Sequence, residues 1–180
     1  MTTRILFVRA VNVGGAKLPM AEFRAWLGDL GATDVRTYIA SGNAVLSIDG
    51  DAAAFDPAAF DRAVEAELTR RYGYVREVIS RSPEQVRAAM DAHPFEVLEP
   101  KCSYVAFLTG APAPDAIEAA RAVPAGHDLW QVVGTELHIR YADGQGSASL
   151  NLDAVLRRLR VKGTARNLRT VRAVLDLAGA

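Results

Sequence analysis

The sequence predicts an α+β fold of two tandem ferredoxin-like βαββαβ repeats, the second incomplete and followed by an added C-terminal helix. Two observations lead to this prediction. Hydrophobic spacing in the first half gives the order strand, helix, strand, strand, helix, strand, and a similar order begins again after residue 100. We therefore expect a first subdomain over residues 1–81, a linker helix and connection over 82–100, and a second subdomain with the C-terminal helix over 101–180.

The elements of the first repeat follow from its hydrophobic pattern. Residues 4–11 are mostly apolar on both faces, which indicates a central strand. Pro19 suits the first turn of a helix, and Gly31 is placed to end that helix. The remaining predicted elements are strands at 35–39 and 44–48 joined by a tight turn at Ser41-Gly42-Asn43, a helix at 57–72 and a strand at 75–79.

The second repeat lacks its last strand in this prediction. Ser82 is a natural cap for a short helix in the connection, at 83–92. A final helix then stands where a strand would complete the repeat. The predicted elements are strands at 102–109, 129–133 and 137–141, and helices at 114–122, 150–159 and 167–178.

Composition narrows the possible functions. The 21 basic and 21 acidic residues give no net charge, which argues against a dedicated DNA coat or a membrane-surface protein. Cys102 is the single cysteine and cannot form an intrachain disulfide, and no signal-peptide or membrane-spanning pattern is present, so we expect a cytoplasmic protein. His93, His127 and His138 show no metal-ligand spacing, so no metal site and no cofactor is predicted.

The loop between the first strand and the first helix is the strongest candidate for a binding site. Two adjacent glycines can present backbone N–H groups, and the helix start that follows carries partial positive charge, which together suit a phosphate or carboxylate. In the predicted topology this loop lies at the same sheet edge as the hairpin turn. The expected ligand-binding residues there are Arg9, Asn12, Gly14, Gly15, Lys17, Ser41 and Asn43.

A structural interpretation of the same residues stays open. The glycines can simply turn the chain, while Asn12 and Asn43 bond the backbone locally.

No catalytic group can be identified from the sequence. Ser41 lacks the surroundings of a hydrolase nucleophile, and no pair of catalytic groups can be identified from spacing.

A second basic region lies near the C-terminus. A polyanion could bind its run of cations, but aromatic residues for stacking bases are missing, and a solvated helix face is the alternative. Arg166 and Asn167 stand at a predicted helix start, where arginine needs an anionic partner, and they join the first site only if this helix folds back over it. The run comprises Arg157, Arg158, Arg160, Lys162, Arg166, Arg169 and Arg172.

Four segments of the chain together form a specific pattern: Arg9 to Gly15, Pro19-Met20 with Glu22 and Phe23, Asp34 to Asn43, and Thr164 to Asn167. This pattern resembles the uncharacterised bacterial family catalogued as domain of unknown function 1697. The resemblance covers essentially the whole chain, and it implies a tandem ferredoxin-like fold but no known activity. It also places the family's signature residues on loops and turns, where function tends to reside.

These observations favour a binding protein for an anionic, phosphate-bearing small molecule or nucleotide at the Gly14-Gly15 loop. Three alternatives remain open. One is a nucleic-acid-binding module that uses the C-terminal arginines. Another is an enzyme of unidentified reaction, with groups such as Arg9, Ser41 and His93 brought together by folding. The third is an interaction protein, such as a homodimer that pairs exposed sheet edges.

Overall fold

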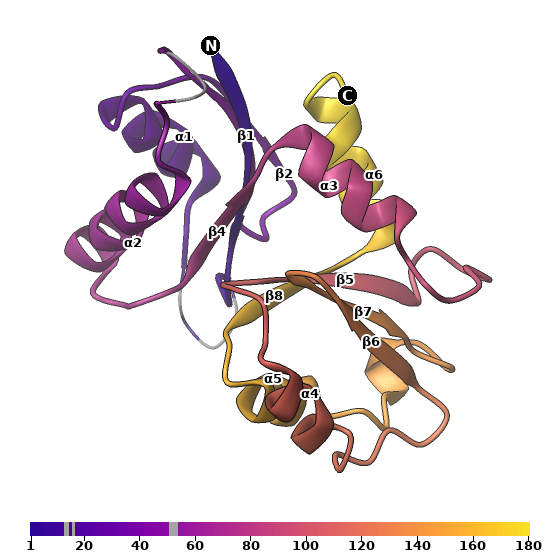
Figure 1. The fold of residues 1–180 in the computed structure, drawn as a ribbon. Helices are drawn as coiled ribbons and strands as arrows, with labels where there is room; N and C mark the ends of the chain where they lie inside the picture. The colour runs from indigo at the N-terminus through magenta and orange to yellow at the C-terminus, as the bar shows by residue number, and fades with distance from the viewer. Residues whose placement is uncertain (13–14, 16, 51–53) are drawn as a thin grey trace. The chain divides into compact units, whose positions relative to one another are not determined.

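The computed structural model describes residues 1–12, 15, 17–50 and 54–180. Over these residues the chain is a mixed α+β protein with two four-stranded antiparallel sheets and six α-helices (Figure 1). The strands are β1 (Thr2–Val8), β2 (Ala32–Tyr38), β3 (Asn43–Ile48), β4 (Val78–Arg81), β5 (Ser103–Leu108), β6 (Leu129–Val133), β7 (Glu136–Arg140) and β8 (Gly163–Asn167). The helices are α1 (Met20–Asp29), α2 (Pro57–Tyr72), α3 (Pro83–Asp91), α4 (Pro114–Ala120), α5 (Leu152–Leu159) and α6 (Leu168–Leu177), with a short 3-10 helix η1 at Gln145–Ser147.

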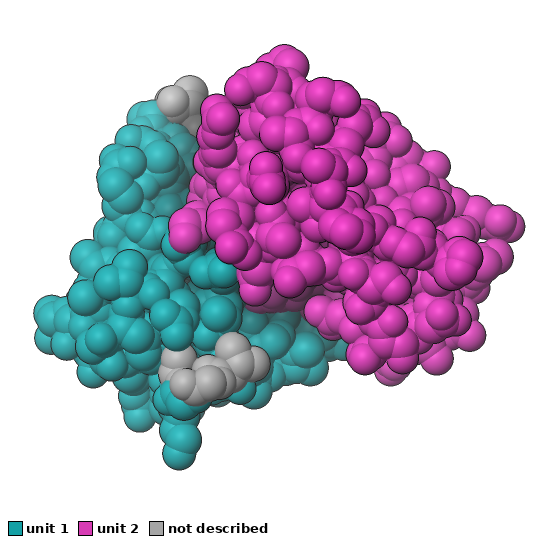
Figure 2. Space-filling view, turned by 90° about the horizontal axis from the view of Figure 1, so that it is seen from below, with its two compact units in different colours: residues 1–87, 173–180 teal, residues 88–172 magenta. Residues whose placement is uncertain are grey.

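The chain divides into two compact units, which Figure 2 shows in different colours. Unit 1 contains residues 1–87 and 173–180, and unit 2 contains residues 88–172. Each unit holds one of the sheets. The predicted division placed residues 173–180 with the second subdomain, whereas they group with unit 1 in the structure.

The sheet of unit 1 has the strand order β2-β3-β1-β4, so β1 is central, as its apolar sequence predicts. Leu6 and Val8 on β1 point into a core that also contains Trp26 of α1 and Leu68 of α2. In Figure 1 both helices lie on one side of this sheet. Burial of this apolar face is what holds the two helices against the strands.

Local sequence explains where α2 begins and ends. The carboxylate of Asp56 accepts hydrogen bonds from the backbone N–H groups of Ala58 and Ala59, and Pro57 occupies the first helical position. Gly73 ends the helix with φ of 71°, a left-handed conformation that glycine adopts without a steric penalty. The bounds of α2 match the predicted helix at 57–72.

Carboxylates of α2 cover the outer edge of β4. Asp61 accepts the N–H of Ser80 at 3.0 Å, and Glu65 accepts the N–H of Val78 at 2.9 Å. These bonds satisfy donors that an edge strand would otherwise offer to another chain. The strand predicted at 75–79 runs instead from Val78 to Arg81, because its backbone pairs with β1 over those four residues.

The sheet of unit 2 has the strand order β6-β7-β5-β8. Its core packs Ala106 and Leu108 of β5 and Ile139 of β7 against Val155 and Leu159 of α5. The prediction that the second repeat lacks its last strand was wrong, because β8 pairs with β5 along its length. The strand was missed because it is short and polar, and because α6 begins at the residue after it with no intervening turn.

A buried carboxylate ties together the loops of unit 2. Asp128 is 5% exposed and accepts hydrogen bonds from the backbone N–H groups of Ala142, Ser149 and Leu150, at 2.8 to 2.9 Å. A buried carboxylate with three donors is well satisfied. Asp128 therefore fixes the segment that leads into α5.

Candidate anion-binding site

The end of β1 lies beside the turn between β2 and β3. The side-chain amide of Asn12 donates to the carbonyl oxygen of Ala40 at 2.7 Å, and the N–H of Val8 donates to the carbonyl oxygen of Gly42 at 2.8 Å. The two segments are thus neighbours at one sheet edge, as the predicted strand order requires. The loop and the turn form one local structure.

Asn12 holds the loop in shape. Its Oδ1 accepts the N–H of Leu18 at 2.9 Å, and its Nδ2 donates to the carbonyl oxygen of Leu18 at 3.3 Å as well as to Ala40. Its backbone adopts φ of 56°, which asparagine tolerates better than most residues. Because these bonds use both ends of the amide, Asn12 positions the loop instead of offering free groups to a ligand.

The turn between β2 and β3 is held by its own side chains. Asn43 is fully buried, and its Nδ2 donates to Ser41 Oγ at 2.8 Å and to the carbonyl oxygen of Tyr38 at 3.3 Å. Gly42 has φ of 74°, and a Cβ there would lie 2.7 Å from Val11 Cγ2 and 2.9 Å from Val8 Cβ. These bonds and contacts fix the conformation of the turn that lies beside the loop after β1.

Residues 74–77, just before β4, also contact the loop after β1. Arg9 forms an ion pair with Glu77 at 3.3 Å, and its N–H donates to the carbonyl oxygen of Glu77. Arg76 donates to the carbonyl oxygen of Ala10 and lies over the ring of Tyr74 at 5.2 Å. The hydroxyl of Tyr74 in turn donates to the carbonyl oxygen of Lys17 at 3.0 Å.

A pocket of about 500 Å3 opens at this edge. Its lining residues come from the loop, the start of α1 and the turn: Asn12, Gly15, Lys17, Leu18, Pro19, Met20 and Ala40. Lys17 is exposed and makes no ion pair with any residue that the structure describes. Gly15 adopts φ of 88° with open space where a side chain would stand. Gly14, the other predicted glycine, lies outside the described residues.

The start of α1 has no side-chain cap. Pro19 occupies the N-cap position, and no described side chain accepts a hydrogen bond from the first turn. The early N–H groups of a helix have no partner within the helix, and they carry partial positive charge. Glu22 in this turn accepts a hydrogen bond from the hydroxyl of Tyr72 at 3.0 Å.

Arg166 and Asn167 belong to β8 in unit 2. Arg166 donates to Thr164 Oγ1 at 2.6 Å and to the carbonyl oxygen of Ala165, and burial lowers its pKa to about 10. Asn167 accepts the N–H of Thr170 at 2.8 Å and so caps the start of α6. Within the same basic run, Arg160 forms an ion pair with Asp115.

Folding also creates a histidine pair that the sequence spacing did not reveal. The Nδ1 atoms of His93 and His138 lie 3.2 Å apart, although 45 residues separate them. His138 is fully buried, and burial lowers its pKa to about 4. No group of three or more histidine, cysteine or acidic side chains suited to a metal ion occurs among the described residues.

None of the described helices is long and apolar enough to cross a membrane.

Three residues that hold the loop after β1 were not predicted from the sequence: Tyr74, Arg76 and Glu77. They reach the loop from more than 50 residues away in the sequence, so no local pattern indicates the contact.

Comparison with known proteins finds a solved structure with a similar fold and a family to which the chain belongs. The solved structure of the conserved bacterial protein SP0830 from Streptococcus pneumoniae matches with a TM-score of 0.72 over 100% of this chain and 99% of that chain, at 20% sequence identity. The chain belongs to the family described as protein of unknown function (DUF1697), whose sequence pattern matches residues 1–138. No curated protein matches the sequence.

Proposed function

We propose that this protein binds an anionic, phosphate-bearing small molecule or nucleotide in the pocket beside Lys17. The observation that carries the proposal is the pairing of an uncapped helix start with a lysine that has no ion-pair partner among the described residues. Pro19 and Met20 of the helix start line the same pocket as Lys17. Backbone N–H groups together with a nearby cation are the usual means of binding phosphate.

The residues at this edge divide into two roles. Lys17 supplies positive charge, and the first N–H groups of α1 donate to the anion, with Gly15 leaving room for its approach. Asn12, Ser41 and Asn43 position the loop and turn through their internal hydrogen bonds. Arg9 contributes less charge, because Glu77 lies 3.3 Å from its guanidinium.

The fold and setting that we propose are consistent with this role. We interpret the two sheets, each with its flanking helices, as tandem ferredoxin-like repeats, because both have the strand order and antiparallel pairing of that unit. We also propose that the protein is cytoplasmic, where phosphorylated metabolites and nucleotides are available.

A thermal-shift and calorimetric comparison tests the proposal. Wild-type protein is titrated with ADP, glucose 6-phosphate and inorganic phosphate, and at least one of these is expected to stabilise it. Lys17→Ala should weaken that binding by about tenfold or more, as expected for loss of a charge-assisted contact. Arg62→Ala, which removes a well-exposed cation of unit 1 outside the pocket, serves as the matched control. Binding that Lys17→Ala leaves unchanged would place the anion elsewhere.

A further inference from the structure

A second pocket, of about 610 Å3, lies entirely within unit 2 and plays no part in the site described above. Its lining residues come from the end of α3, the segment before β5 and the start of α6: Met90, Asp91, Val97, Glu99, Pro100, Lys101, Leu168, Arg169 and Arg172. Its volume falls in the range of small-molecule sites.

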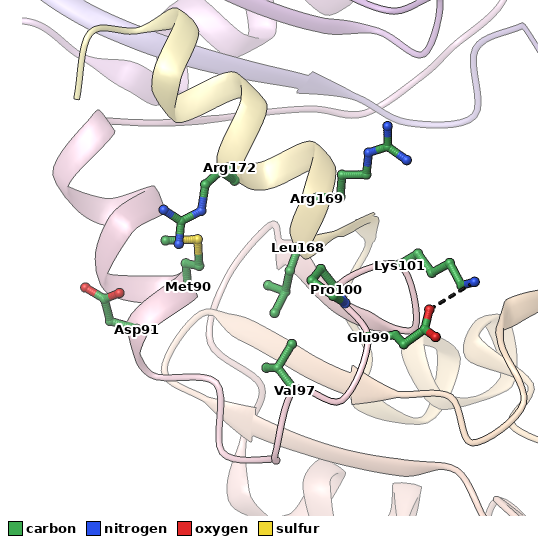
Figure 3. Close-up of a pocket in the computed structure, with 9 residues that line it drawn as sticks. All are labelled: Met90, Asp91, Val97, Glu99, Pro100, Lys101, Leu168, Arg169 and Arg172. Atoms are coloured by element: carbon green, nitrogen blue, oxygen red, sulfur yellow. Dashed lines mark ion pairs between the residues drawn. The ribbon is translucent and has the colours of Figure 1, made fainter.

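The centre of this pocket is apolar. In Figure 3 the side chain of Leu168 points toward Val97 and Pro100, and Met90 lies to one side. Val97 is 42% exposed and the adjacent Leu98 is 69% exposed, so this short segment presents two large apolar side chains to solvent. Exposed apolar side chains grouped at a concave surface are typical of a ligand site.

The rim of the pocket carries cations without partners. Arg169 and Arg172 extend on opposite sides of Leu168 in Figure 3, and neither forms an ion pair with a described residue. Lys101 is already paired with Glu99 at 2.9 Å. Asp91 is the remaining acid at the rim and lies on the side of Arg172. With Lys101 and Glu99 balanced, the two arginines leave the rim with more positive than negative charge.

We propose that this pocket binds an organic carboxylate with an apolar body, such as a medium-chain aliphatic acid. The apolar body packs on the buried Leu168 and covers Val97 and Pro100, and it removes the exposed surface of the latter two residues from water. The carboxylate head lies at the arginine rim, because a guanidinium donates two parallel hydrogen bonds to a carboxylate. An apolar ligand alone would leave the arginines at the rim without a role, and a small anion alone would leave the apolar centre uncovered. A carboxylate with an apolar body uses both parts of the pocket.

Isothermal titration with decanoate, well below its micelle concentration, tests this proposal on the full chain. Two probes separate the contributions: acetate has the head without the body, and decanol has the body without the charge. We expect decanoate to bind at least tenfold more tightly than either probe. We also expect the double variant Arg169→Gln/Arg172→Gln and the single variant Val97→Ser each to weaken decanoate binding at least tenfold.

The exposed pair Arg157→Gln/Arg158→Gln on α5 removes the same charge outside the pocket and should leave decanoate binding unchanged. Equal binding of decanol and decanoate, or full binding by the Arg169→Gln/Arg172→Gln variant, would overturn the proposal. Light scattering gives a further check. A dimer that Val97→Ser dissociates would show that a second copy fills the pocket, which also overturns it. Lys17→Ala should not affect decanoate binding, so the two sites are tested separately.

Discussion

The side-chain amide of Asn12 donates a 2.7 Å hydrogen bond to the carbonyl oxygen of Ala40, and so joins the loop after β1 to the turn between β2 and β3. The same amide also donates to the carbonyl oxygen of Leu18 and accepts the backbone N–H of Leu18. Asn12 therefore determines where the loop residue Lys17 and the start of α1 lie. Any ligand bound at this edge depends on that arrangement.

Asn12→Ala should lower the free energy of unfolding by about 1–3 kcal/mol, because it leaves partly buried backbone groups without partners. Asn12→Gly separates the two contributions, since glycine accepts φ of 56° without strain but makes no side-chain bonds. Urea denaturation measures both variants. If both unfold like the wild type, these hydrogen bonds do not hold the loop.

Gly42→Ala should be the more damaging of two glycine substitutions. An alanine there combines left-handed backbone strain with close contacts to Val8 and Val11, for a loss of about 2–5 kcal/mol. Gly31→Ala has a similar φ, 85°, but meets nothing within 4 Å, so it should cost only about 1 kcal/mol. Equal losses in chemical denaturation would show that packing under the turn is unimportant.

Asp128→Ala should strongly destabilise unit 2. It leaves the N–H groups of Ala142, Ser149 and Leu150 without their acceptor, at a cost of about 3 kcal/mol or more. Asp143→Ala removes an exposed carboxylate from a nearby loop and should change stability by less than about 0.5 kcal/mol. Amide hydrogen exchange of residues 142–150 would report the effect directly, and unchanged protection in Asp128→Ala would contradict it.

Stability should fall as the pH drops from about 6.5 toward 4, because of His138. Burial lowers its pKa in the folded protein to about 4, so between these values the unfolded chain binds more protons than the folded one. The full contribution, on the order of 3 kcal/mol, is present above the unfolded pKa and is lost on acidification. Burial lowers the pKa of His93 as well, which acts in the same direction.

Urea denaturation at several pH values between 7.5 and 4.5 measures this effect. His138→Gln should flatten the dependence, whereas His127→Gln, at an exposed position, should keep the wild-type slope. Identical slopes for the wild type and His138→Gln would mean that His138 does not titrate as its burial requires.

Much of the fold could be predicted from hydrophobic spacing. The helix at 57–72 and the strand at 129–133 coincide with α2 and β6, because a glycine follows each of them and ends it, Gly73 after α2 and Gly134 after β6. The nearness of Asn12 to the hairpin turn also followed from strand order. Topology brings these segments together regardless of side-chain detail.

Other features depend on contacts that a single sequence does not display. Strand β8 is recognisable only by its pairing with β5, and Gly163 there is explained by Leu108, whose Cδ2 would lie 2.8 Å from an added Cβ. Sequence also does not distinguish an asparagine that bonds a ligand from one that bonds its own backbone. For Asn12, that distinction required the positions of Leu18 and Ala40.

The most direct test of anion binding at this edge is an amide NMR titration of the full chain with ADP. We predict that the largest shifts fall on Gly15, Lys17 and the first-turn amides Met20 and Ala21, and that Lys17→Ala reduces them at equal ligand concentration. Shifts confined to other parts of the chain, with these amides unmoved at saturation, would contradict the account.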